Sequence, residues 1–134
     1  KTNTFEFIVN SMDILMHMSS FEFSRGEHKI DRISRILKHI LNHKNLYPLY
    51  PPNAESFIEF NNLSCNANIS AEPHLLILPS NLCPFIKKID NTLCINPSQF
   101  YKGTRSSFYC RFQLVGANDG TISQENSIIQ ILKL

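Results

Sequence analysis

The 134-residue sequence lacks several features that would assign a function directly. Its four cysteines, Cys65, Cys83, Cys94 and Cys110, form no Cys-x-x-Cys pair, which excludes zinc sites of that kind and a dense disulfide scaffold. We therefore expect buried, reduced thiols and an intracellular compartment. No apolar run approaches the ~20 residues needed to cross a membrane, so no membrane partner is expected.

An excess of charge of one sign is also missing. The chain has 13 Lys and Arg against 11 Asp and Glu, and the net charge of +2 is too small to indicate nucleic-acid binding by itself. With 43% hydrophobic and 18% charged residues, the composition predicts a folded chain with a weakly charged surface. The length suits one domain or part of a larger one. Lys1-Thr2-Asn3 is neither a start nor a signal peptide, so we expect an excised fragment.

The clearest element of the first half is a helix that begins after Asp31 and ends near His43. Aspartate is a good N-cap, and a cationic residue suits the C-terminal end. The apolar positions follow helical spacing and form one stripe, consisting of Ile33, Ile36, Leu37, Ile40 and Leu41. Upstream, residues 4–9 alternate weakly and predict a strand, while residues 13–18 fit a short helix or a strand equally.

Residues 47–52 contain three prolines and predict an extended strap that Tyr47 and Tyr50 pin against a neighbouring surface. After the strap, residues 56–61 favour a short edge strand and residues 61–72 a polar loop. The later segments predict strands at 75–78, 84–89, 92–95, 106–114 and 127–134, with a hairpin at Asp90-Asn91 and a connector at 116–126. The fold class is therefore α+β or α/β, with one good helix and a mostly antiparallel sheet of four to five strands.

The buried strand at 75–78 ends in a polar turn, where such folds often place their chemistry. The turn reads Pro79-Ser80-Asn81-Leu82, and none of these side chains is a neutral-pH base or a strong transition-metal ligand. Ser80 also lacks the flanking glycines of a nucleophile elbow, and His74 precedes the strand at its far end. We therefore predict no catalytic residue, no cofactor and no metal.

Two other groups of residues have both a functional and a structural interpretation. His39 and His43 have the helical spacing of a zinc-binding pair, but the glutamate of a zincin motif is absent, so solvated histidines are favoured. Five basic residues of the second half could contact phosphates or could protect strand edges, namely Lys87, Lys88, Lys102, Arg105 and Arg111. Their aromatic neighbours could stack bases, but aromatics at alternating strand spacing are more often core residues. A small nucleic-acid-binding module stays the alternative.

Several segments together resemble the family of B (second, non-catalytic) subunits of DNA polymerase alpha. The likeness begins at residues 10–17 (NSMDILMH), and it is most specific at residues 31–41 (DRISRILKHIL) followed by 47–52 (YPLYPP). It continues through residues 73–82 (PHLLILPSNL), 94–97 (CINP), Lys102-Gly103 and 128–134. The polar stretches at 19–30 and 116–126 diverge most.

The resemblance implies the C-terminal portion of a calcineurin-like phosphoesterase domain that has lost its catalysis, with the whole of 1–134 in one domain. In active members of the fold, the strand like 75–78 ends in Gly-His-x-His, so Ser80 and Leu82 stand where two metal-binding histidines would be. A metal-dependent phosphoesterase fragment is the alternative that these two residues argue against. The family also usually has Gly-Arg or Gly-Lys after Asn-Pro, whereas this chain has Ser98-Gln99.

The resemblance further implies a non-catalytic scaffold of the polymerase alpha–primase complex, acting in the nucleus. Its partners would be the C-terminal domain of the catalytic subunit and, through the complex, primase, with any DNA contact indirect. Aromatic anchors make good interface contacts. We therefore expect partner contacts at two places, the strap and the exposed strand edges near residues 102–108, with the candidate residues Tyr47, Tyr50, Pro51, Lys102 and Arg105.

Overall fold

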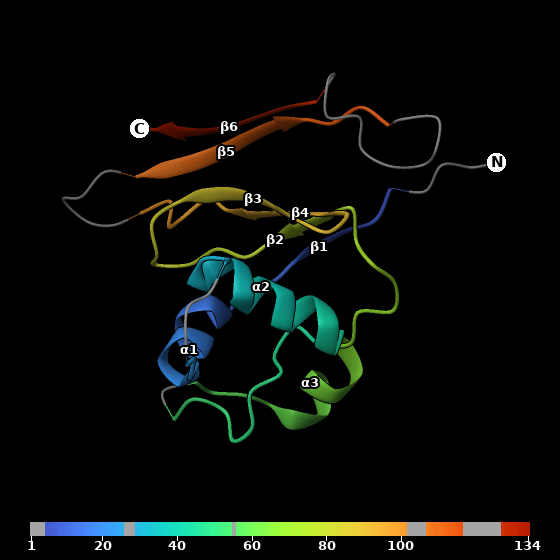
Figure 1. The fold of residues 1–134 in the computed structure, drawn as a ribbon, viewed down its shortest axis with the longest axis vertical. Helices are drawn as coiled ribbons and strands as arrows, with labels where there is room; N and C mark the ends of the chain where they lie inside the picture. Colours follow the sequence, from blue (N-terminus) through green and yellow to red (C-terminus); the bar gives the residue numbers. More distant parts are fainter. Residues whose placement is uncertain (1–4, 26–28, 55, 102–106, 117–126) are drawn as a thin grey trace.

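The computed structural model describes residues 5–25, 29–54, 56–101, 107–116 and 127–134. Figure 1 shows helices on one side of a four-stranded sheet and a two-stranded hairpin on the other side. No helix in these ranges is long and apolar enough to span a membrane. In chain order the elements are β1 (Phe7–Val9), α1 (Ile14–Phe21), α2 (Arg32–His43), α3 (Phe60–Asn66), β2 (Leu75–Ile77), β3 (Phe85–Ile89), β4 (Thr92–Asn96), β5 (Phe108–Gln113) and β6 (Ile128–Lys133).

The main sheet has the strand order β1-β2-β4-β3 and is mixed. The central strand β2 is parallel to both neighbours, with Leu76 opposite Ile8 on β1 and Cys94 on β4. Only β3 and β4 form the predicted antiparallel hairpin, and β5 pairs with β6 in a separate sheet. The expectation of one mostly antiparallel sheet is therefore wrong, because parallel pairing joins segments that are far apart in the sequence.

The hydrophobic core lies between the helices and one face of this sheet. The apolar stripe of α2 supplies Ile36, Leu37 and Ile40, which are fully buried, as predicted from their spacing. They pack with Ile14 and Leu15 of α1 and with the sheet residues Leu76 and Cys94. Burial of seven such side chains, each contributing about 1.5–3 kcal/mol, makes this layer the main stabilising contact of the fold.

The opposite face of the sheet is covered unevenly. Side chains alternate along a strand, so Leu75 and Ile95 point away from the helices, and both are nonetheless buried. Figure 1 shows the β5–β6 hairpin on that side of the sheet. On the edge strand β1, by contrast, Phe7 and Val9 remain largely exposed.

The two long helices follow from their caps. The Asp31 carboxylate accepts the backbone N–H of Ser34 at 3.1 Å, and α2 ends at Lys44 in the left-handed conformation, φ 48°. Asp13 caps α1 in the same way by accepting the N–H of Met16 at 3.1 Å. The ambiguous segment 13–18 is thus helical.

The expected edge strand at 56–61 and the loop at 61–72 are wrong where α3 occupies them. The Glu59 carboxylate begins this helix by accepting the backbone N–H groups of Asn61 and Asn62, at 3.1 and 2.9 Å. None of the α3 residues is fully buried. A helix of 7 residues without an apolar stripe gives no periodic signal, which explains why the sequence pattern did not indicate it.

All four cysteines are free thiols, as expected, but they are not all buried. Cys94 lies in the core and Cys110 is half-buried, whereas Cys65 and Cys83 are exposed. The expectation of burial is therefore wrong for these last two, which lie on α3 and in the turn before β3, outside the core layer.

Candidate interaction surface

The turn that follows β2 is held by hydrogen bonds to its backbone. The Ser80 side chain is buried, and its hydroxyl accepts the N–H of Leu82 at 3.2 Å. The Ser80 N–H in turn donates to Asn96 Oδ1 at 3.0 Å. At the outer side of the turn, Asn81 donates its N–H to the Asp13 carboxylate at 2.8 Å, which ties the turn to the cap of α1.

Asn96, the last residue of β4, organises this region. Its Oδ1 accepts a second N–H, from Ser98 at 2.8 Å, and its Nδ2 donates to the carbonyls of Leu82 and Cys83, at 3.4 and 3.2 Å. A single fully buried amide thus joins the ends of β2 and β4 to the start of β3. Our sequence prediction missed this role, although the Asn96-Pro97 dipeptide at the end of a strand was a turn signal.

These contacts define the chemistry that the turn can perform. The Ser80 hydroxyl is committed to the backbone, Leu82 is apolar, and the nearest carboxylate with a hydrogen bond to the turn, Asp13, already caps a helix. Within the described ranges, no group of three or more His, Cys, Asp or Glu residues is placed to hold a metal ion. The residues that are present therefore form a structural connection between strands.

Ser98 adopts a backbone conformation that favours glycine, with φ 67°. The residue is buried, and its hydroxyl has no hydrogen-bond partner among the described residues. The positive φ gives a physical reason for the glycine that the resembled family usually has after Asn-Pro. Serine at this position carries both a steric cost and the cost of a buried, unpaired hydroxyl.

The strap at residues 47–52 is pinned by one of its two tyrosines. Tyr47 is only 4% exposed, and its hydroxyl accepts the N–H of Asn53 at 3.1 Å and lies 3.2 Å from His17 Nδ1 and 3.5 Å from Ser56 Oγ. The Tyr47 side chain is therefore engaged within the fold, and its expected role as a partner contact stays a prediction.

Tyr50 and Pro51 lie at the outside of the strap. The Tyr50 side chain is 90% exposed, and Pro51 is also exposed. The expectation that Tyr50 pins the strap is wrong, because the buried anchor at Tyr47 already fixes it and leaves Tyr50 in solvent. An exposed tyrosine on an anchored segment is the arrangement expected of a recognition residue.

Three of the five predicted basic residues lie in the part of the chain that the structure describes, two on β3 and one on β5. Lys102 and Arg105 lie outside the described residues. Lys87 is paired with Asp31 at 2.9 Å, so this strand-edge lysine joins β3 to the cap of α2. Lys88 and Arg111 are exposed on separate sheets, as expected for charges that protect strand edges. His39 and His43 are likewise exposed, in agreement with the solvated interpretation.

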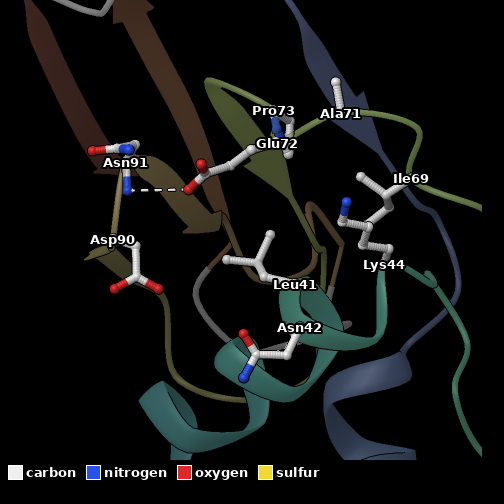
Figure 2. Close-up of a pocket in the computed structure, with 9 residues that line it drawn as sticks. All are labelled: Leu41, Asn42, Lys44, Ile69, Ala71, Glu72, Pro73, Asp90 and Asn91. Carbon is white, nitrogen blue, oxygen red and sulfur yellow. Dashed lines mark hydrogen bonds between the residues drawn. The ribbon is translucent and has the colours of Figure 1, made fainter.

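A notch of about 440 Å³ lies between the end of α2, the segment before β2 and the β3–β4 turn. Figure 2 shows Leu41 at its centre, with Glu72 and Asp90 toward the hairpin and Lys44 on the opposite side. The Glu72 carboxylate accepts the N–H of Asn91 at 3.3 Å and so supports the hairpin turn. Among the predicted site residues that the structure describes, none lines this notch.

Comparison with known proteins identifies the family to which this sequence belongs. The profile of the family of DNA polymerase alpha/epsilon B subunits matches residues 1–87. The chain belongs to this family of DNA polymerase accessory subunits.

Within the family, the chain is similar to the B subunits of DNA polymerase alpha from several organisms. The Rattus norvegicus protein is 36% identical over 118 residues, which cover 88% of this chain and 20% of the relative. The Bos taurus protein is 33% identical over 132 residues, covering 94% and 22%, and the Schizosaccharomyces pombe protein is 27% identical over 129 residues, covering 92% and 22%. The chain thus spans about a fifth of the length of these relatives.

Proposed function

We propose that this chain is the C-terminal portion of the phosphoesterase-like domain of a DNA polymerase alpha B subunit, and that it serves as a non-catalytic scaffold. It would act in the nucleus, within the polymerase alpha–primase complex, by tethering the catalytic subunit during the initiation of DNA replication. The observation that carries the proposal is the similarity to the polymerase alpha B subunits over most of the chain.

The turn after β2 supports a non-catalytic role. If the chain has the calcineurin-like frame, Ser80 and Leu82 occupy the positions of two metal-binding histidines. A two-metal centre needs several charged or imidazole ligands to hold its cations. Here the hydroxyl of Ser80 accepts a backbone N–H and the alkyl chain of Leu82 offers no lone pair, so neither side chain would hold a metal ion in such a frame.

One edge of β1 pairs with no other strand among the described residues, which supports the assignment to a larger domain. Residues 7–9 carry no charge and no proline, and Phe7 and Val9 are largely exposed. Such an apolar edge is one that folded proteins normally cover with another strand or segment. A sheet that continues beyond β1 would satisfy the backbone groups of this edge and bury both side chains.

The scaffold proposal is tested by co-expressing the tagged full-length protein with the polymerase catalytic subunit. We expect the two to copurify, and we expect the Tyr50→Ala variant to recover less catalytic subunit. The matched control is Phe57→Ala, which removes another fully exposed aromatic side chain, outside the strap. Failure of the catalytic subunit to copurify with the unaltered protein would overturn the proposal.

A second assay separates the scaffold from an active phosphoesterase. The purified protein is incubated with Mn²⁺ and bis(p-nitrophenyl) phosphate, and we expect no release of nitrophenolate above the rate with metal alone. Turnover that disappears on substitution of a metal ligand of the same chain would show that the domain is an enzyme.

A further inference from the structure

A second, smaller groove of about 200 Å³ lies where α1, α2 and the strap meet. Its lining includes the buried side chains of Met18 and Ile36, with Leu49 of the strap half-buried beside them. Phe21, at the end of α1, also lines it although it is 60% exposed. We call this the α1–α2 groove, and Figure 1 shows the two helices that form it side by side.

Apolar exposure at the rim of the groove has no explanation within the described fold. Phe23, which follows α1 and lines the same groove, is 91% exposed. Two phenylalanines two positions apart therefore present apolar surface to water next to a depression with an aliphatic floor. Exposed apolar surface of this kind, rimmed by polar groups, marks interaction sites.

The α2 wall of the groove carries charge of one sign. The helix α2 has no aspartate or glutamate from residue 32 to residue 43, and it has three Lys or Arg and two His. The exposed His39 and His43 line the groove directly, and their ring N–H groups can donate to a carboxylate. This wall therefore favours a partner that brings negative charge.

Glu22 is the acidic side chain among the described residues of the lining, and it does not offset this charge. The Glu22 carboxylate is bound by Arg35 at 2.8 Å and by Arg32 at 3.0 Å, so two cations accompany one anion. The hydrogen bond from Arg35 is the largest cause of the lowered pKa of Glu22, and Arg32 adds to it. Glu22 thus stays ionised and internally paired, and it fixes α1 against α2.

We propose that the α1–α2 groove binds an acidic peptide segment that inserts one apolar side chain over Met18 and Leu49 and sets its carboxylates against His39 and His43. The aliphatic floor and small volume suit a single side chain better than a stacked base. The two arginines best suited to phosphate are already engaged by Glu22. An acidic peptide therefore matches the groove in shape and charge, whichever protein supplies it.

The probe is a fluorescein-labelled 14-residue peptide with leucines at positions i, i+3 and i+4 and glutamates between them. The full chain is added in increasing concentration, and binding is followed by fluorescence anisotropy. We expect His39→Glu and Phe21→Ala each to weaken binding by about 5- to 10-fold, the loss typical of a central interface residue. The matched controls are Lys88→Glu and Phe57→Ala, which alter an exposed charge and an exposed aromatic outside the groove. Both controls are expected to bind within about twofold of the unaltered protein.

Thermal melts followed by circular dichroism show whether each variant is folded. If Phe21→Ala melts early, His39→Gln tests the same rim by removing the imidazole ring at an exposed position. Absence of binding, or equal binding of a peptide with lysines in place of the glutamates, would overturn the proposal. The proposal would also be overturned if oligothymidylate bound more tightly than the acidic peptide and the same two substitutions abolished that binding. The groove would then be a nucleic-acid site. Each of these results can occur with copurification of the catalytic subunit intact, so the two proposals fail separately.

Discussion

At the scale of single residues, the fold depends on a few polar side chains that composition does not reveal. Asn96 holds two N–H groups and two carbonyls at the ends of three strands. Tyr47 and Tyr50 are of the same residue type and three positions apart, yet one is buried and the other is solvated. The sequence indicated the strap through its prolines, but which tyrosine is the anchor depends on Asn53 and His17, which lie outside the strap.

The backbone of Ser98 predicts a stabilising substitution. Ser98→Gly removes a Cβ from a residue at φ 67° and a buried hydroxyl that lacks a partner among the described residues. We expect the free energy of unfolding, measured by urea denaturation, to rise by about 1 kcal/mol. Ser98→Ala removes only the hydroxyl and is expected to gain less. A loss of stability in Ser98→Gly would contradict this account.

The four thiols are expected to differ sharply in reactivity. Burial raises the pKa of Cys94 to about 12, so almost no thiolate forms at pH 8, and the side chain is fully enclosed. Cys65 and Cys83 are exposed and are expected to react first with iodoacetamide, followed by Cys110, whose pKa burial also raises. Peptide mass spectrometry after timed labelling measures the order. Early labelling of Cys94 in the folded protein would show that the core layer opens.

At the scale of elements, predictability followed the strength of local signals. The helix α2 was predicted at both ends because it combines a good cap, an apolar stripe and a cationic last turn. The β3–β4 hairpin was predicted because Asp90-Asn91 lies between two apolar segments, and Asp90 adopts φ 49° there. The helix α3 escaped prediction because its first-turn contacts come from Glu59, a residue with modest cap propensity, and because it lacks an apolar stripe.

The cap of α2 predicts a dependence of stability on pH. Hydrogen bonds from Ser34, then the contact with Lys87, hold the pKa of Asp31 well below its ordinary value of 3.8. A carboxyl whose pKa is depressed in the folded state stabilises the fold fully at pH values above its pKa in the unfolded chain. This stabilisation decreases progressively as the pH falls further. Asp31→Asn keeps an oxygen that can accept the Ser34 N–H but loses the charge.

We expect Asp31→Asn to lower the free energy of unfolding at pH 7 by about 1 kcal/mol or less, since the carboxylate is half exposed. The difference from the unaltered protein should shrink below pH 4, as followed by urea denaturation at several pH values. Lys87→Met removes one partner only and is expected to have a smaller effect. If the difference in unfolding free energy between Asp31→Asn and the unaltered protein stayed constant from pH 7 to pH 3, the effect would come from packing and not from the charge.

At the scale of the whole molecule, the structure combines a helix-covered sheet with a separate hairpin. The sheet face toward the helices contains most of the fully buried side chains, whereas no residue of β5 or β6 is fully buried. The sequence predicted each strand of this hairpin, but not that the hairpin forms its own sheet. The reason is that strand patterns report which side chains are apolar and do not report which strands pair.

This organisation predicts unequal protection from hydrogen exchange. A two-stranded antiparallel ribbon is marginally stable by itself, and β5–β6 has few buried side chains to hold it on the sheet. We expect its amides to exchange through local opening, well before those of β2 and β4. Exchange followed by mass spectrometry measures this order. Simultaneous exchange of the hairpin and the central strands would show that they unfold as one unit.

The placement of β2 between two parallel neighbours affects how the chain reaches this structure. During synthesis β1 leaves the ribosome long before β2 and β4 exist, whereas α1 and α2 need only nearby residues to form. The central pairings close long loops, and loop closure of this kind slows folding. The nascent helices must therefore keep their apolar faces together until the last part of the sheet is translated, and crowding by other unfinished chains at that stage would favour aggregation.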